Sequence, residues 1–168
     1  MRPVLSSLPL AVAADIVARA IELRRAAGLL PLAVAVLDSG GHLVAFQRED
    51  GSGVLRFDIA CGKAWGALGM GMSSRQIRDR LAARPAFQGA LAAASGGRFV
   101  PVPGGVLILD AAGNAIGAVG ISGDASDKDE YCAIEAVKAA GCGADPTEPN
   151  PAGREAGLER RAARLHHP

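Results

Sequence analysis

Pro31-Leu-Ala-Val-Ala-Val-Leu-Asp38 is the stretch of sequence that decides the fold. Its apolar residues run without interruption, which predicts a strand that is covered on both faces. Asp38-Ser-Gly-Gly41 then predicts a tight turn, because an Asp side chain bonds turn N–H groups and Gly accepts a positive φ. Residues 42–48 return as the second strand, so the region is predicted to be a β-hairpin.

A second hairpin repeats this turn design. Leu109-Asp110-Ala-Ala-Gly113-Asn-Ala-Ile116 aligns with Leu37-Asp38-Ser-Gly-Gly41-His-Leu-Val44. Strands are therefore expected over residues 106–110 and 115–122. Together the two hairpins predict an α+β fold, with a central antiparallel sheet of about five strands flanked by helices. The layout would be like that of profilin or PAS domains.

Helical patterns flank both hairpins. The first helix is expected over residues 9–27, with Ser7 as its cap and Gly28 as its end. Further helices are expected over residues 54–71, from the capping box Ser73-Ser-Arg-Gln76 to residue 83, and over residues 127–140 behind a Ser126 cap. Arg84-Pro85 is expected to end the third of these helices, and a Gly/Ala-rich connection would then lead to Phe99.

The composition argues against several classes of function. There are 18 Lys and Arg against 17 Asp and Glu, a net charge of +1, and the aromatic residues are one Trp, one Tyr and four Phe. Nucleic-acid channels usually need a basic surface and several stacking side chains. Asp15, Arg19, Asp38 and Lys63 interrupt the apolar runs before any reaches the roughly 18 residues of a membrane span. We therefore expect neither nucleic acid nor a membrane as a partner.

The cysteines and the chain ends suggest compartment and organisation. Cys61, Cys132 and Cys142 form no CxxC pair and leave an odd count, which predicts reduced thiols and a cytoplasmic protein. The N-terminus imitates a signal peptide, but its apolar spacing continues unbroken as one helical face. Residues 1–140 are predicted to form one domain. Residues 141–168 would be a Pro/Gly-rich linker and a short Arg-rich C-terminal tail.

Lys63 is the most informative charged residue. It is the only charge between Ile59 and Met72, a predicted helix of small and apolar side chains. One interpretation is that its stem covers apolar surface while its ammonium group reaches water. The other is a partly desolvated lysine that binds a ligand carboxylate, or that has a lowered pKa and acts as a base. The residues alone leave both open.

Other candidates lie at glycine-rich edges. Pro103-Gly104-Gly105 would let the backbone approach a ligand closely. The loop containing Gly123 opens the last long helix, where the alternatives are plain capping and an anion site. Glu130 would point toward Lys63 as a pairing acid. His42 is either an exposed turn residue or a ligand, and Arg48 is either solvated or captures a carboxylate. Cys61 and Cys132 are predicted to be buried small hydrophobic residues, and Trp65 and Met70 to be core or cavity wall.

Four motifs together resemble a known family. They are Leu32-Ala-Val-Ala-Val-Leu-Asp38-Ser-Gly-Gly-His-Leu-Val-Ala-Phe46-Gln-Arg48, Asp58-Ile-Ala-x-x-Lys63, Val102-Pro-Gly-Gly105, and Gly117-Ala-Val-Gly-Ile-Ser-Gly123 with Asp129-Glu130. In this order they resemble the haem-binding or haem-degrading GlcG/HbpS-like domain, which also forms the C-terminal part of PduO-type proteins. The resemblance covers about residues 8–140. It implies an α+β domain that forms homo-oligomers and binds haem or a related tetrapyrrole.

Two functions follow as hypotheses. The first is a protein that binds haem or another carboxylate-bearing planar ligand, with candidate binding residues Lys63, Pro103, Gly104, Gly105, Gly123, Arg48 and His42. The second is an isomerase, lyase or hydratase acting on a small oxo or hydroxy acid, with candidate catalytic residues Lys63, Glu130 and Asp38. Haem is the only cofactor expected, and no metal ligands are assigned. The sequence does not decide whether the protein is an enzyme.

Overall fold

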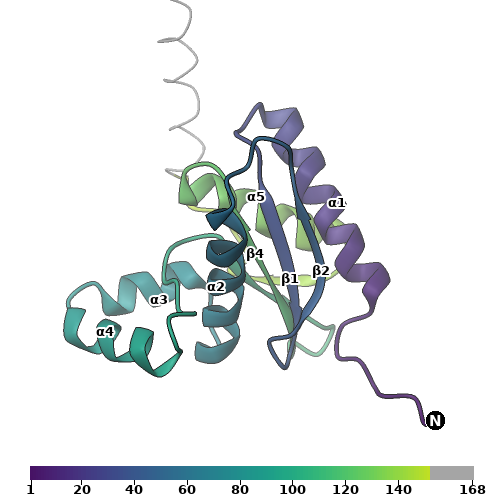
Figure 1. Ribbon diagram of the computed structural model, residues 1–168. Helices are drawn as coiled ribbons and strands as arrows, with labels where there is room; N and C mark the ends of the chain where they lie inside the picture. Colours follow the sequence, from purple (N-terminus) through teal and green to yellow (C-terminus); the bar gives the residue numbers. More distant parts are fainter. Residues whose placement is uncertain (152–168) are drawn as a thin grey trace, which may run out of the picture.

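The sheet contains both predicted hairpins and one further strand. A computed structural model describes residues 1–151 of the 168. Its antiparallel sheet has the order β2-β1-β4-β3-β5 (Figure 1). The strands are β1 (Ala33–Asp38), β2 (Leu43–Arg48), β3 (Gly105–Leu109), β4 (Ala115–Ser122) and β5 (Gly143–Asp145). The hairpins β1–β2 and β3–β4 are confirmed, and they join side by side through β1 and β4.

Five helices accompany the sheet in the described residues 1–151, and the predicted α+β class is confirmed. They are α1 (Leu10–Ala27), α2 (Leu55–Met70), α3 (Ser74–Leu81), α4 (Pro85–Ala94) and α5 (Ser126–Ala139). Helices α1 and α5 pack on one face of the sheet and α2 packs on the other, while α3 and α4 extend to one side (Figure 1). None of these helices is long and apolar enough to cross a membrane.

Several helix ends follow the predicted signals and others differ. Gly28 ends α1 in the left-handed conformation, with φ 63°, and the Ser73 side chain caps α3 by accepting from the Gln76 N–H. Ser7 does not cap α1. Its hydroxyl accepts from the Ser39 N–H instead. Ser126 is the first residue of α5 rather than its cap, because the cap position falls on Ala125, which makes no side-chain cap bond.

Two segments were predicted wrongly. The supposed connection after residue 84 is helix α4, because Pro85 occupies the first helical turn, where its missing N–H costs nothing. Residues 143–145, expected to lie in the linker, form the edge strand β5 and pair with β3. The predicted Arg-rich helical tail, residues 158–165, lies outside the described residues.

Small residues let α2 approach the sheet closely. Ala35, Gly120 and Gly105 form one row across β1, β4 and β3, on the face toward α2. A Cβ atom at Gly120 would collide with the backbone carbonyl of Ala60, and one at Gly105 with that of Lys63. The opposite face carries larger side chains, such as Val34 and Ile121, which pack against α1 and α5. The glycines therefore bring the backbone of α2, and Lys63 with it, onto the sheet.

Candidate functional site

Lys63 lies in a sealed junction between α2, the end of β4 and α5. Its side chain is only 2% exposed. The Nζ atom donates to the Ile121 carbonyl at 2.8 Å and to Asp129 Oδ2 at 2.9 Å. The other Asp129 oxygen accepts from the Asp124 N–H at 3.0 Å. The ammonium group thus connects helices that lie on opposite faces of the sheet.

Burial dominates the electrostatics of this pair. Loss of water lowers the pKa of Lys63 and raises the pKa of Asp129, and in each case the partner's charge opposes the shift. A buried pair of this kind is costly to break, because either group alone would be a charge without compensation. The charge of Lys63 is therefore already matched within the fold.

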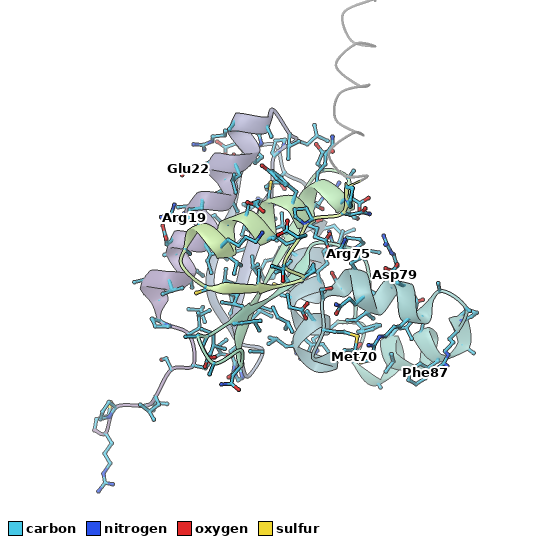
Figure 2. The ribbon with its side chains drawn as sticks, turned by 180° about the vertical axis from the view of Figure 1, so that it is seen from behind. Arg19, Glu22, Met70, Arg75, Asp79 and Phe87 are labelled. Atoms are coloured by element: carbon cyan, nitrogen blue, oxygen red, sulfur yellow. The ribbon has the colours of Figure 1, made fainter. Side chains whose placement is uncertain are left out.

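The acid that pairs with Lys63 is not the predicted one. Glu130 is fully buried and forms an ion pair with Arg75 of α3, whose Nε lies 3.2 Å from Glu130 Oε1. Figure 2 shows Arg75 on the side of the molecule where α3 approaches α5. Burial raises the pKa of Glu130, while the positive charge of Arg75 and the backbone of Asn150 act in the opposite direction. Consecutive residues of α5 point in different directions, so Asp129 faces Lys63 and Glu130 faces Arg75.

The predicted glycine loop does meet Lys63. A Cβ atom at Gly104, where φ is 117°, would lie 2.9 Å from Lys63 Nζ. The loop's polar groups are used inside the fold: the Gly104 carbonyl accepts from the Ile121 N–H, and the Gly105 N–H donates to Ser74 Oγ at 2.7 Å. The Gly123 N–H likewise donates to the Asp129 carboxylate and partly opposes the rise in its pKa that burial causes. Residues 103–105, Gly123 and Lys63 are brought together as a packed junction.

An open cavity, which we call the Trp65 pocket, lies on another side of α2. Its volume is about 460 Å³. Trp65 forms part of the wall, and the guanidinium carbon of Arg98 lies 4.2 Å from its ring centroid. Burial raises the pKa of the Cys61 thiol in this wall to about 11. The lining residues are Leu37, Gly41, Leu43, Phe57, Asp58, Cys61, Gly62, Trp65, Gly96, Gly97 and Arg98.

Comparison with known proteins gives the family. The model of the haem-degrading, HbpS-like protein family matches residues 8–138. This chain belongs to the HbpS-like family. A curated relative is an uncharacterised 15.0 kDa protein from the dhaT-dhaS intergenic region of Citrobacter freundii. It is 32% identical over 126 residues, which cover 74% of this chain and 87% of the relative.

Solved structures share the HbpS-like fold. A PduOC–haem complex superposes with a TM-score of 0.73 at 23% identity, covering 84% of this chain and 99% of that one. The Klebsiella pneumoniae protein ORFY gives 0.72 at 24% identity, covering 83% and 94%. A double mutant of Streptomyces reticuli HbpS gives 0.68 at 24% identity, covering 83% and 90%. At these identities the likeness establishes the fold of the chain.

Two predicted site residues of this HbpS-like chain lie in the β1–β2 turn. Asp38 Oδ1 accepts from the Gly40 and His42 N–H groups, each at 2.9 Å, and the bond from His42 is the main cause of the lowered pKa of Asp38. The His42 side chain is 82% exposed. The turn reaches the rim of the Trp65 pocket through Gly41 and Leu43. Lys63, in contrast, meets the sheet where β4 ends, so Asp38 and Lys63 occupy opposite ends of the sheet.

Arg48 lies apart from both places. It lines a second cavity of about 410 Å³ at the end of β2, together with Arg24 and Arg25 of α1.

Across residues 1–151 no group of three His, Cys, Asp or Glu side chains is placed to hold a metal ion. Cys61, Cys132 and Cys142 are all free thiols. Arg98 is the residue that sequence reasoning missed, since no motif or periodicity relates it to Trp65.

Proposed function

We propose that this HbpS-like protein binds haem, or a related planar ligand with carboxylate groups, in the Trp65 pocket. The observation that carries the proposal is the stacking of the Arg98 guanidinium on Trp65 at the wall of an apolar cavity. Its volume of about 460 Å³ lies within the usual range for small-molecule sites. The relationship to the PduOC–haem complex supports the same ligand class.

The residues of the pocket fit the chemical groups of haem. Leu37, Leu43 and Phe57 provide apolar surface for the ring system. Arg98 would bind a propionate carboxylate. The exposed His42 imidazole, in the turn at the rim, would be the ligand for iron, because burial raises the pKa of the Cys61 thiol to about 11 and iron binds the thiolate form. Bound haem would supply the redox chemistry of its iron, which the surrounding side chains tune through polarity and access.

The role first assigned to Lys63 passes to Arg98 in this proposal. Lys63 donates to Asp129 and to a backbone carbonyl and lines neither the Trp65 pocket nor the Arg48 cavity. A ligand carboxylate could reach it only if the ion pair with Asp129 opened. The same contacts disfavour Lys63 as the base of an enzyme that acts on a small oxo or hydroxy acid. The homo-oligomer implied by the family resemblance stays a prediction.

Haemin titration followed by the Soret band tests the proposal. The wild-type protein should give a saturable shift. Arg98→Gln should weaken binding about tenfold, the effect of losing one charge-assisted hydrogen bond, and Trp65→Ala should weaken it at least as much. The control is Arg80→Gln, which removes an exposed arginine of α3 and should leave binding unchanged.

Esterified haemin isolates the role of Arg98. Haemin dimethyl ester lacks the propionate charges, so it should bind the wild-type protein and Arg98→Gln with similar affinity. No Soret shift at micromolar haemin would refute haem binding. An unchanged affinity in both Trp65→Ala and Arg98→Gln would show that haem binds at another place on the protein.

A further inference from the structure

The cavity that contains Arg48 is a second candidate binding site. We call it the Arg48 cavity. It has a volume of about 410 Å³ and lies where α1 ends, beside Pro31 and the end of β2. The Trp65 pocket is lined by Leu43, at the start of β2, whereas this cavity is lined by Gln47 and Arg48 at the other end of the strand. The two sites are separate.

The charges of the Arg48 cavity are not balanced. Arg24 and Arg25 converge on the carboxylate of Glu49, with Nε–O distances of 3.3 and 3.5 Å. Glu49 is only 11% exposed and also accepts from the Leu32 N–H at 2.9 Å. Arg48 is paired with Ala33 through the backbone of the sheet, but within residues 1–151 its side chain makes no hydrogen bond or ion pair. Three guanidinium groups thus face two carboxylates, those of Glu49 and Asp50.

We propose that the Arg48 cavity binds a small organic acid through its carboxylate. A guanidinium group with free N–H donors matches a carboxylate in two parallel hydrogen bonds. Arg25 is 67% exposed and its Nε lies 3.5 Å from Glu49 Oε1, so its terminal N–H groups can serve the same ligand. Glu49 shows that this part of the molecule already accommodates a carboxylate between two arginines.

The apolar part of the cavity favours an organic acid over an inorganic anion. Ile21, only 7% exposed, and Pro31 line it beside the charged groups. A ligand with a short carbon chain can place methylene groups against these two residues while its carboxylate meets Arg48. Inorganic phosphate has the charge but no surface to bury there.

Calorimetric titration with succinate tests this proposal. The wild-type protein should bind succinate saturably, and should bind inorganic phosphate more weakly. Arg48→Gln should weaken succinate binding about tenfold, and Arg25→Gln should weaken it by a smaller factor, because the Arg25 guanidinium is already paired with Glu49. The control is Arg19→Gln, which removes an arginine on the outer side of α1 near Glu22 and should leave binding unchanged (Figure 2).

The outcomes separate this site from the haem pocket. Arg98→Gln should bind succinate as the wild-type protein does, so failure of haem binding would leave the organic-acid site standing. Absence of binding at millimolar succinate would overturn the proposal. Equal affinity of the wild-type protein and Arg48→Gln would also overturn it. Tighter binding of phosphate than of succinate would show that the apolar residues do not select the ligand.

Discussion

Lys63 and Trp65 lie two residues apart in α2 and have opposite surroundings. Lys63 is buried against the end of β4 and holds Asp129 of α5 at 2.9 Å. Trp65 is half-buried, lines an open cavity, and has the guanidinium group of Arg98 over its ring. Positions i and i+2 of a helix point about 200° apart, so neighbouring residues serve different sides.

The difference shows which charged groups near α2 are paired within the protein and which can meet a ligand. On the sealed side, an ion pair ties α2 to α5, and its charges are satisfied by groups of the protein itself. On the open side, the cavity wall is largely apolar, and the cation at the Trp65 ring comes from a different segment, residue 98. A lone charge in an apolar helix therefore indicates a buried structural partner here, while ligand recognition falls to an arginine beside an aromatic ring.

Replacement of Lys63 should give the largest effect on stability. Lys63→Met leaves Asp129 buried without its partner, and the loss of a buried pair member typically costs about 3–5 kcal/mol. Denaturant unfolding should therefore show a large fall in the free energy of unfolding, with haemin affinity of the folded protein unchanged. A stable Lys63→Met variant that no longer bound haemin would reverse the assignment of the two sides.

An exposed ion pair provides the matched control for Lys63. Arg19 and Asp15 form a pair of similar length, 2.8 Å, on the surface of α1. Arg19→Met should have little measurable effect, because solvent screens exposed pairs. The double variant Lys63→Met/Asp129→Leu should recover part of the lost stability, since it removes both buried charges. Without any such recovery, the loss in Lys63→Met would come from packing rather than from the unpaired carboxylate.

The buried Glu130 should make the stability of the protein depend on pH. Burial raises its pKa in the folded protein, so the folded state holds the proton to higher pH than the unfolded chain. Its contribution to stability is therefore present at low pH and is lost as pH rises from the unfolded pKa, near 4.5, through the folded one. Glu130→Gln has no carboxyl group to ionise at this position. Its free energy of unfolding, relative to that of the wild type, should therefore rise as pH increases from the unfolded to the folded pKa of Glu130. The gain is about 1.4 kcal/mol for each unit separating the two pKa values.

Unfolding curves across this pH range would measure the effect of Glu130→Gln. The variant also lacks the ion pair with Arg75, which the wild-type protein has wherever Glu130 is ionised. The informative quantity is therefore the change with pH of the stability difference between variant and wild type, rather than its value at one pH. A constant difference between wild type and variant would mean that Glu130 titrates alike in the folded and unfolded states. Haemin binding should be unchanged, because Glu130 does not line the Trp65 pocket.

Much of the fold was predictable because its signals are local. The Asp-x-x-Gly turns at Asp38 and Asp110 predict both hairpins, and Gly28 and Ser73 mark helix ends by their own backbone and side-chain chemistry. Strand β5 carries no such signal, since it has three residues and exists only through pairing with β3. Helix α4 was missed because Pro85 can either end one helix or begin the next.

The site was less predictable because its contacts join distant segments. The sequence singled out Lys63 and its closeness to residues 103–105, and the structure brings these together. The choice between Asp129 and Glu130 depends on the rotation of α5, which the composition of the helix does not determine. Trp65 was recognised as a possible cavity wall, but Arg98 approaches it from a loop 33 positions later, where no periodicity connects the two.

Substitutions in the two similar hairpin turns should have the smallest effect on stability, and they test whether Asp38 takes part in ligand binding. Asp38 borders the Trp65 pocket through its turn, and Asp110 occupies the equivalent position in the β3–β4 turn. N–H donors, chiefly those of His42 and Asn114 respectively, lower both pKa values below the ordinary 3.8. Each carboxylate thus adds stability above pH 3.8 that is lost as pH falls through the lowered pKa.

Asp38→Asn and Asp110→Asn should each cause a small loss of stability at neutral pH. In urea unfolding, the free energy of unfolding of each variant should fall less steeply than that of the wild type as the solution becomes acidic. Neither substitution should change haemin affinity. A change in affinity confined to Asp38→Asn would give Asp38 a part in ligand binding that its turn contacts do not require.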